Sequence, residues 1–130
     1  MAKVIRQKVT FRKAAPAQLW RAFMDNATHG KICGGRAVIG KKPGAKWSAY
    51  DGYCFGTQLV LEKNRRIVQT WRAADWPKDQ LSVLVLEFAP RGEGGVLTMA
   101  HHGVPKKFVA EISAGWKEFY WTPMKKLFGE

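Results

Sequence analysis

The chain has 130 residues, of which 46% are hydrophobic, so it is long enough to bury a core and too apolar for general disorder. Lysine and arginine number 22 against 10 acidic residues, and the net charge of +12 favours acidic partners over basic ones. A well-solvated basic surface explains the same charge without any partner. Because no run of about 18 apolar residues occurs, and because the charged N-terminus does not resemble a signal peptide, we expect no membrane span and a cytoplasmic location.

The first part of the chain predicts one strand followed by two short helices. Residues 3–13 alternate in polarity, and one face carries Ile5, Gln7, Val9 and Phe11, which is typical of a half-buried strand. Pro16 favours a first helical turn, and Leu19, Trp20 and Phe23 then give a short apolar helical face. Residues 26–35 predict a second short helix that ends at Gly34–Gly35.

Residues 36–103 have a period close to two, which predicts a run of antiparallel strands. Asp51–Gly52 is a hairpin signal between two of them. The expected strands cover residues 37–40, 46–50, 53–62, 67–73, 81–89 and 96–102.

The last 26 residues, 105–130, form the longest helix-period pattern of the chain. In a helical projection the apolar stripe lies within about 60° of Trp116. It contains Val109, Ile112, Phe119, Tyr120, Pro123 and Leu127. Because Pro123 cannot donate to the Phe119 carbonyl, we expect a bend or a break there that leaves a polar carbonyl near the interior. Trp121 projects away from the stripe, either as an exposed partner contact or packed under a neighbouring loop.

These elements together predict an α+β fold in a single domain over residues 1–130. A curved antiparallel sheet of six to seven strands would wrap on the long C-terminal helix, with two short helices after the first strand.

The chain shows no pattern for a catalytic, cofactor or metal site. It lacks a phosphate-binding loop and a nucleophile elbow. His29 and Cys33 are four residues apart, but two ligands do not make a zinc site. His101 and His102 are adjacent in a predicted strand, so one of them is expected to face the interior. Cys33 and Cys54 are expected to stay reduced, with Cys54 as a small buried hydrophobe.

Four segments resemble a known family. They are DGYCFG (51–56), WRAADWP (71–77), GVP (103–105) and GWKEFYWTPMKKLF (115–128). The family includes the C-terminal domain of the activator of Hsp90 ATPase, and it belongs to the START/Bet v 1-like helix-grip superfamily. The resemblance implies a sheet wrapped on a long helix, with a hydrophobic cavity between them.

The residues that match the family signature imply a framework role more than an activity. They are Trp71, Arg72, Trp76, Pro77, Gly115 and Trp116. On this basis Gly115 would let the helix approach a strand closely, and Arg72 would pair with Asp51 or Glu87. The eukaryotic activator also carries an N-terminal domain with no counterpart in these 130 residues, and Pro123 departs from the pattern expected of the closing helix.

The preferred functional hypothesis is a non-enzymatic domain that binds a small apolar molecule between helix and sheet. Six tryptophans are many for this length, and large aromatic side chains can line a cavity. A tight aromatic core without a cavity is the alternative. The predicted ligand-binding residues are Trp20, Phe23, Trp71, Met99, His101, Trp116, Phe119 and Tyr120.

A second hypothesis is a co-chaperone-like module whose basic face binds an Hsp90-class chaperone or another acidic protein. Its predicted contacts are Arg6, Lys8, Arg12, Lys106, Lys107, Trp121, Lys125 and Lys126. A cyclase- or hydrolase-like enzyme that uses His101 or Glu87 ranks below both. Nucleic-acid binding is not favoured, because the basic residues are scattered and no RNA-binding motif accompanies them.

Overall fold

The computed structural model describes residues 4–130, so Lys3, the first residue of the first predicted strand, lies outside it. Within these residues seven strands form one sheet in the order β1-β7-β6-β5-β4-β3-β2, and every neighbouring pair is antiparallel. The strands are β1 (Ile5–Phe11), β2 (Val38–Ile39), β3 (Lys46–Ala49), β4 (Cys54–Glu62), β5 (Arg66–Ala73), β6 (Ser82–Arg91) and β7 (Gly94–His102).

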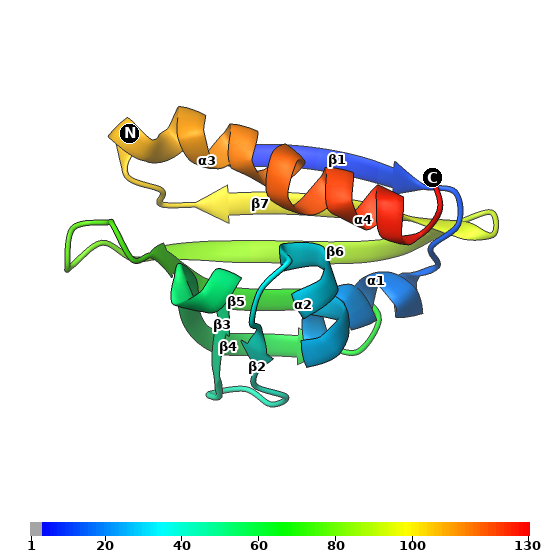
Figure 1. Ribbon diagram of the computed structural model, residues 1–130, viewed down its shortest axis with the longest axis horizontal. Helices are drawn as coiled ribbons and strands as arrows, with labels where there is room; N and C mark the ends of the chain where they lie inside the picture. Colours follow the sequence, from blue (N-terminus) through cyan, green and yellow to red (C-terminus); the bar gives the residue numbers. More distant parts are fainter. Residues whose placement is uncertain (1–3) are drawn as a thin grey trace.

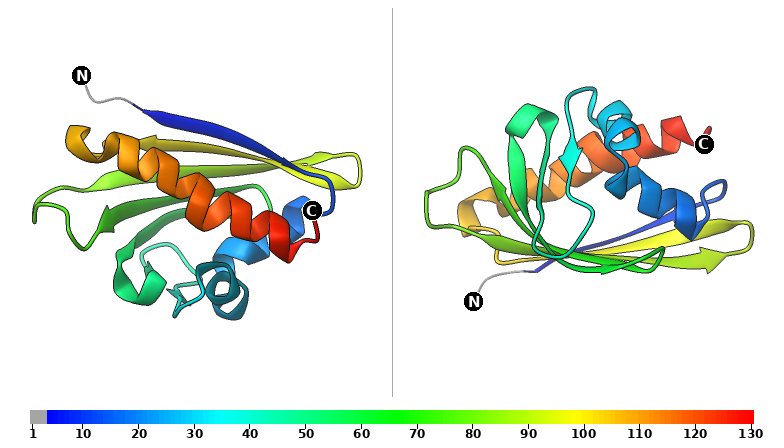
Figure 2. Two further views of the ribbon diagram at one scale, coloured as in Figure 1. Left: turned by 45° about the horizontal axis from the view of Figure 1, so that its top comes forward. Right: turned by 90° about the horizontal axis from the view of Figure 1, so that it is seen from below.

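The helices lie on one side of this sheet, and the longest helical segment crosses it (Figures 1 and 2). The early helices are α1 (Pro16–Met24) and α2 (Asn26–Cys33), and the short turn η1 (Tyr50–Gly52) precedes β4. The closing helix consists of η2 (Lys106–Phe108), α3 (Val109–Trp116), η3 (Lys117–Trp121) and α4 (Thr122–Leu127). The predicted α+β architecture is therefore confirmed. None of the helices in residues 4–130 is long and apolar enough to span a membrane.

Strand alternation builds the core on the helix-covered face of the sheet. Along β5, every second residue from Ile67 to Ala73 is buried, and β6 and β7 show the same alternation. The fully or almost fully buried strand residues include Ile67, Leu84, Leu86, Leu97, Met99 and His101. The first strand also follows its pattern, since Ile5 and Phe11 are buried.

Local signals set the ends of the early helices, and two of them, Pro16 and Gly34, are those that the sequence predicts. Pro16 opens α1. Asp25 caps α2, because its carboxylate accepts the Thr28 N–H at 2.9 Å. Gly34 ends α2 in the left-handed conformation, with φ of 68°, where glycine has no steric penalty.

The closing helix contains one π-helical turn where α3 meets α4. The Thr122 N–H donates to the carbonyl of Lys117, five residues earlier. Backbone angles stay helical on both sides of this turn, so the chain continues through Pro123 instead of breaking. The wider turn also takes in one extra residue, which changes the direction of the side chains that follow it.

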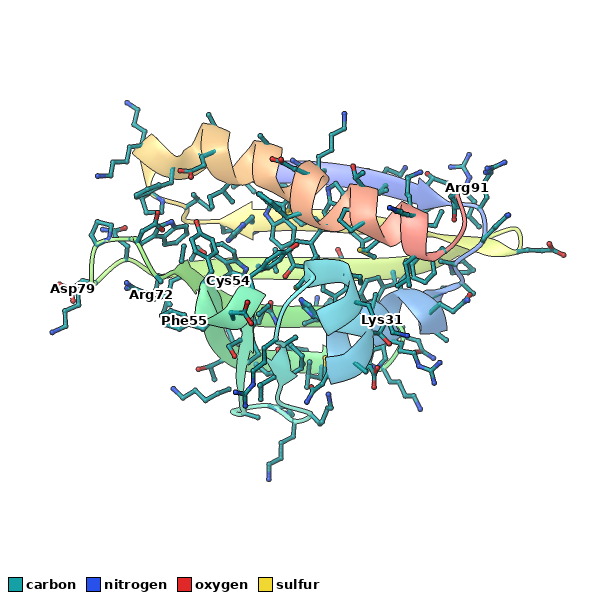
Figure 3. The ribbon with its side chains drawn as sticks, in the orientation of Figure 1. Lys31, Cys54, Phe55, Arg72, Asp79 and Arg91 are labelled. Carbon is teal, nitrogen blue, oxygen red and sulfur yellow. The ribbon has the colours of Figure 1, made fainter. Side chains whose placement is uncertain are left out.

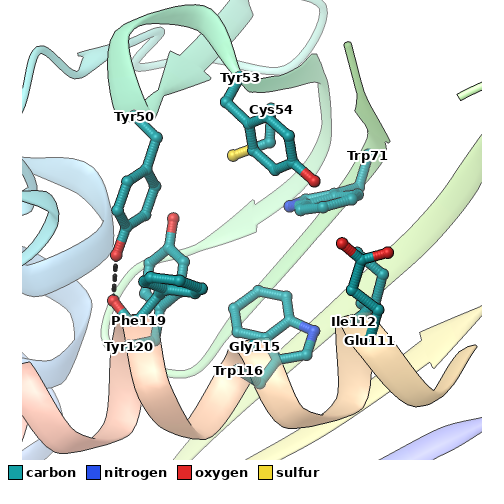
Figure 4. Close-up of a pocket in the computed structure, with 10 residues that line it drawn as sticks. All are labelled: Tyr50, Tyr53, Cys54, Trp71, Glu111, Ile112, Gly115, Trp116, Phe119 and Tyr120. Carbon is teal, nitrogen blue, oxygen red and sulfur yellow. Dashed lines mark hydrogen bonds between the residues drawn. The ribbon is translucent and has the colours of Figure 1, made fainter. Parts of the chain in front are cut away.

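The connection from β3 to β4 differs from a simple two-residue hairpin. Tyr50, Asp51 and Gly52 all have positive φ, at 53°, 56° and 90°. The Asp51 carboxylate accepts the Arg36 N–H at 2.7 Å and so helps to hold this uncommon backbone. The turn directs Tyr50 towards the closing helix (Figure 4).

Candidate functional site

A pocket of about 430 Å³ lies between the closing helix and the sheet (Figure 4). The helix supplies one wall, and the turn before β4 together with β5 supplies the other. Ten described residues line it: Tyr50, Tyr53, Cys54, Trp71, Glu111, Ile112, Gly115, Trp116, Phe119 and Tyr120.

The helical wall follows from sequence spacing. Glu111, Gly115 and Phe119 are four residues apart, and so are Ile112, Trp116 and Tyr120. Residues at this spacing lie one above another on a helix. The smallest of them, Gly115, leaves open space: a Cβ atom built there would meet only the Phe119 ring, at 3.6 Å. The expected close approach of Gly115 to a strand is therefore wrong, and the glycine widens the pocket instead.

Trp116 anchors the pocket floor. Its ring lies 4.8 Å from that of Tyr120 and 6.2 Å from that of Trp71, measured between centroids. Its Nε1–H donates to His101 Nδ1 at 3.1 Å. The other ring nitrogen of His101 therefore carries the proton and donates to Ser82 Oγ at 2.8 Å, and the Ser82 hydroxyl donates to the Trp71 carbonyl. This chain of hydrogen bonds links the Trp116 ring to the main chain of Trp71.

The second histidine holds the inner end of the pocket in the same way. His29 Nδ1 lies 3.2 Å from the Phe23 carbonyl and so donates to it, which leaves Nε2 to accept the Tyr120 hydroxyl at 2.9 Å. Burial is the main cause that lowers the pKa of His29 to about 4 and that of His101 to about 3. Both histidines are neutral at pH 7.

The thiols near the pocket are also uncharged at neutral pH. Burial raises the pKa of Cys54 to about 12, and burial likewise raises that of Cys33. A protonated thiol is a weak nucleophile. In the part of the chain that the structure describes, no group of three or more His, Cys, Asp or Glu side chains is placed to hold a metal ion. The site therefore offers aromatic surface, a few neutral polar tips and the Glu111 carboxylate.

The mouth of the pocket is formed by half-exposed aromatic residues. Phe119 is 49% exposed and Tyr53 is 40% exposed. The Tyr50 hydroxyl donates to the Phe119 carbonyl, so the turn before β4 is tied to the helix at one end of the mouth. Glu111 is exposed at the other end, and Figure 4 shows its side chain directed towards Trp71.

The structure brings four of the eight predicted ligand-binding residues into the pocket wall. These are Trp71, Trp116, Phe119 and Tyr120. Met99 and His101 are fully buried side chains of β7 outside the lining, and Phe23 stacks on Tyr120 at 5.7 Å between centroids. Trp20 is half-buried and lies outside the lining.

Sequence reasoning missed Tyr50, Tyr53 and Glu111 because loop placement and the tilt of a helix are not visible in a pattern. The DGYCFG segment (51–56) was the available signal for Tyr53, and Tyr50 directly precedes it. Cys54, Ile112 and Gly115 were noticed, but as core or framework residues.

Trp121 is buried, contrary to its projected outward direction. Its ring stacks on Trp116 at 5.3 Å between centroids, and its Nε1–H donates to Gln7 Oε1 at 2.6 Å. The π turn explains the difference, because the extra residue in that turn brings Trp121 back over Trp116. Phe119, which was also expected in the apolar stripe, is half-exposed at the mouth of the pocket.

The remaining predicted partner contacts are divided between two faces. Gln7 faces the helix, since it donates to the Ser113 carbonyl at 2.9 Å, so Arg6 and Lys8 belong to the opposite strand face. Lys106 and Lys107 are the first residues of the closing helix, so they lie on the side of the sheet that the helix covers. Of the others, Arg12 and Lys126 are exposed, whereas Lys125 is half-buried and donates to the Thr10 carbonyl at 3.0 Å.

Arg72 caps a loop and does not pair with Asp51 or Glu87. Its guanidinium donates to four main-chain carbonyls in the loop from β5 to β6, at 2.6–3.2 Å, and it lies over the Phe55 ring (Figure 3). The four acceptors are Trp76, Pro77, Lys78 and Gln80. A planar fork with five donors suits this task. The loop then holds Trp76 against Trp71, at 5.3 Å between centroids.

A curved antiparallel sheet wrapped on a C-terminal helix, with an aromatic pocket between the two, defines a helix-grip protein. The chain belongs to the family described as Activator of Hsp90 ATPase homolog 1-like protein, whose sequence profile matches residues 13–129. The resemblance seen in the four sequence segments is thereby confirmed.

Two curated relatives show how far the similarity extends. An uncharacterised protein of Schizosaccharomyces pombe is 30% identical over 116 residues, which are 88% of this chain and 34% of that protein. The mouse activator of 90 kDa heat shock protein ATPase homolog 2 is 26% identical over 110 residues, which are 85% of this chain and 33% of that protein. The chain therefore spans about a third of the length of these relatives.

Among solved structures, an HSP90 activator from Plasmodium falciparum superposes with a TM-score of 0.86. The similarity covers 99% of this chain and 96% of that one, at 24% sequence identity. At this level of identity the match supports the fold.

Proposed function

We propose that this chain is a binding domain that holds a small apolar molecule between its closing helix and its sheet. The observation that supports this most directly is the aromatic pocket of about 430 Å³. This volume falls within the range of small-molecule sites, and burial of apolar surface alone can drive binding there. The neutral histidines and protonated thiols fit a site that binds without chemical reaction.

Native mass spectrometry of the purified protein, repeated after denaturation, tests this proposal. We expect extra mass that disappears on denaturation. In parallel, the neutral fluorescent probe N-phenyl-1-naphthylamine should bind to the purified protein after any carried ligand has been removed.

A substitution at Gly115 makes the test specific for the pocket. Gly115→Leu places a large side chain in the open space beside Phe119 and should abolish probe binding while the fold is retained. Glu118→Leu adds the same side chain at an exposed helix position outside the lining and should leave binding unchanged. A bare mass together with no probe binding by the unmodified protein would contradict the proposal.

A second candidate function is binding to an Hsp90-class chaperone. Family membership and the mouse relative's name favour it, as does the set of exposed basic residues. Exposed charges act mainly within a screening length of about 8 Å at physiological ionic strength, so this binding should weaken as salt rises.

A low-salt pull-down with a purified Hsp90-class protein tests this second candidate. Because the basic residues lie on two faces, two charge-reversed variants locate the contact: Arg6→Glu with Lys8→Glu, and Lys106→Glu with Lys107→Glu. One pair should lose binding and the other should keep it. Absence of binding at low salt by the unmodified chain would exclude this function.

A further inference from the structure

The charge of the pocket wall is opposite in sign to that of the chain. Lysine and arginine outnumber the acidic residues by 22 to 10, yet none of the ten described lining residues is a lysine or an arginine. The one carboxylate among them is that of Glu111. An anionic head group would therefore meet no cation inside the pocket, and it would meet one negative charge.

Six of the ten lining residues are aromatic, and they come from both walls (Figure 4). Trp71 and Trp116 lie 6.2 Å apart between centroids, and Tyr50 and Phe119 lie 5.8 Å apart. The face of an aromatic ring carries negative potential and attracts a cation within about 6 Å of its centroid, most strongly in tryptophan. The two rings of each pair contact one another, so a cationic group in the pocket would lie against the rings and not between the members of a pair.

The carboxylates of Asp75 and Glu111 lie close enough to Tyr53, at the mouth of the pocket, to act on its hydroxyl. Burial raises the pKa of Tyr53, and the charges of Asp75 and Glu111 raise it further. A field that disfavours a phenolate at this place favours a positive charge there. The overall charge of +12 opposes the approach of a cation from a distance, but salt screens that repulsion beyond about 8 Å. The charges of the residues at the mouth therefore determine the electrostatic effect on a bound cation.

We propose that the pocket takes an organic cation, with an ammonium group that lies against the aromatic rings of the lining and faces the Glu111 carboxylate, and with an apolar body buried against Ile112 and Tyr120. This inference rests on the small-molecule binding proposed above and specifies the chemical class of its ligand.

Three probes of similar size separate charge from apolar surface. Benzyltrimethylammonium is the cation, neopentylbenzene is its neutral isostere, and phenylacetate is an anion. A purely apolar pocket binds the neutral molecule more tightly, because the cation has to leave water. We expect the opposite order, with the cation bound about fivefold more tightly than the neutral isostere and the anion bound least. Titrations followed by tryptophan fluorescence at physiological salt measure this, because Trp71 and Trp116 line the site.

Glu111→Gln tests the carboxylate without disturbing the fold, since Glu111 is exposed. It should weaken cation binding about fivefold, as expected for a partly solvated ion pair, and leave the neutral isostere unchanged. Glu118→Gln removes the same charge from an exposed position of the closing helix outside the pocket and should change neither affinity.

The outcomes separate this inference from the function on which it rests. Neutral binding equal to or tighter than cation binding, with no effect of Glu111→Gln, would overturn the inference and leave the pocket as a binding site for neutral molecules. Failure of all three probes to bind the unmodified protein would overturn both.

Discussion

The Tyr50 hydroxyl donates to the main-chain carbonyl of Phe119, which Pro123 leaves without its usual helical donor. Tyr50 belongs to the left-handed turn before β4, and Phe119 belongs to the π turn of the closing helix. The hydrogen bond therefore joins the two walls of the pocket at its mouth. The carbonyl expected near the interior from the position of Pro123 is thus satisfied by a side chain far away in sequence.

Removal of this hydroxyl should lower the stability of the protein and leave the aromatic ring of residue 50 in place at the mouth of the pocket. Tyr50→Phe keeps the ring that lies 5.8 Å from Phe119 and 5.7 Å from Tyr120, between centroids. We expect the free energy of unfolding to fall by about 1 kcal/mol, the net value of one such hydrogen bond. Urea denaturation with an unchanged m-value measures it.

Pro123→Ala provides the control for this prediction. Alanine restores an N–H that can serve the Phe119 carbonyl, so Tyr50→Phe should cost less in the Pro123→Ala background than in the unmodified chain. Equal losses in the two backgrounds would show that the Tyr50 hydroxyl and Pro123 are not coupled.

Two glycine substitutions should have opposite effects on stability. A Cβ at Gly56 would lie 1.9 Å from the Thr70 carbonyl oxygen on the paired strand, whereas a Cβ at Gly115 faces the pocket. Gly56→Ala should destabilise the protein by more than about 2 kcal/mol, because backbone has to move. Gly115→Ala should be neutral or should stabilise by up to about 1 kcal/mol, because alanine favours the helix. Thermal unfolding of both variants measures these changes in stability. A similar loss of stability in both variants would contradict the assignment of Gly115 to open space.

The loop after β5 should depend on the shape of the Arg72 side chain and not only on its charge. Arg72→Lys keeps the charge but cannot reach four carbonyls with one fork. We expect trypsin to cleave after Lys78 about fivefold faster, because the loss of one or two hydrogen bonds lowers the local stability of the loop. Arg91→Lys, at the end of β6 (Figure 3), should leave this cleavage rate unchanged. Equal rates in all three proteins would mean that Arg72 does not hold the loop.

The two buried histidines should make stability depend on pH between about 5 and 6.5. Their folded pKa values, about 3 for His101 and about 4 for His29, lie below the ordinary value of 6.5. The unfolded chain therefore binds more protons in this range, so stability decreases as pH falls below 6.5. Each histidine contributes up to about 1.4 kcal/mol per pH unit.

Substitution of either histidine should remove its share of this pH dependence. His101→Gln lowers stability at every pH, but the informative quantity is the slope of unfolding free energy against pH, which should fall by about half. His29→Gln should do the same. A slope that neither substitution changes would assign the pH dependence to other groups.

Much of the fold follows from local patterns because each pattern reports a local physical constraint. Alternation along residues 67–73 and 81–89 predicts strands since successive side chains point to opposite faces. The 3.6-residue period after Pro105 predicts the closing helix. Pro16 and Gly34 mark helix ends through backbone conformations that other residues adopt less readily.

The pocket itself is less accessible from the sequence. Trp71, Trp116 and Tyr120 lie on predicted inner faces, and these faces do meet. The sequence pattern does not reveal that the turn at Tyr50 folds over the helix, that Met99 is fully buried, or that Phe23 stacks on Tyr120. It also does not reveal the π turn, so a regular projection places Trp121 outside although it is buried.

The sequence by itself determined the order and type of the elements and the family to which the chain belongs. Those properties depend on neighbours within a few residues or on short motifs. Only the tertiary structure decided that Gly115 opens a cavity, that Glu111 is directed towards Trp71 at its mouth and that Tyr50 closes one end. Each of these depends on contacts between residues that are far apart in the chain, and such contacts are fixed by packing geometry that no local period records.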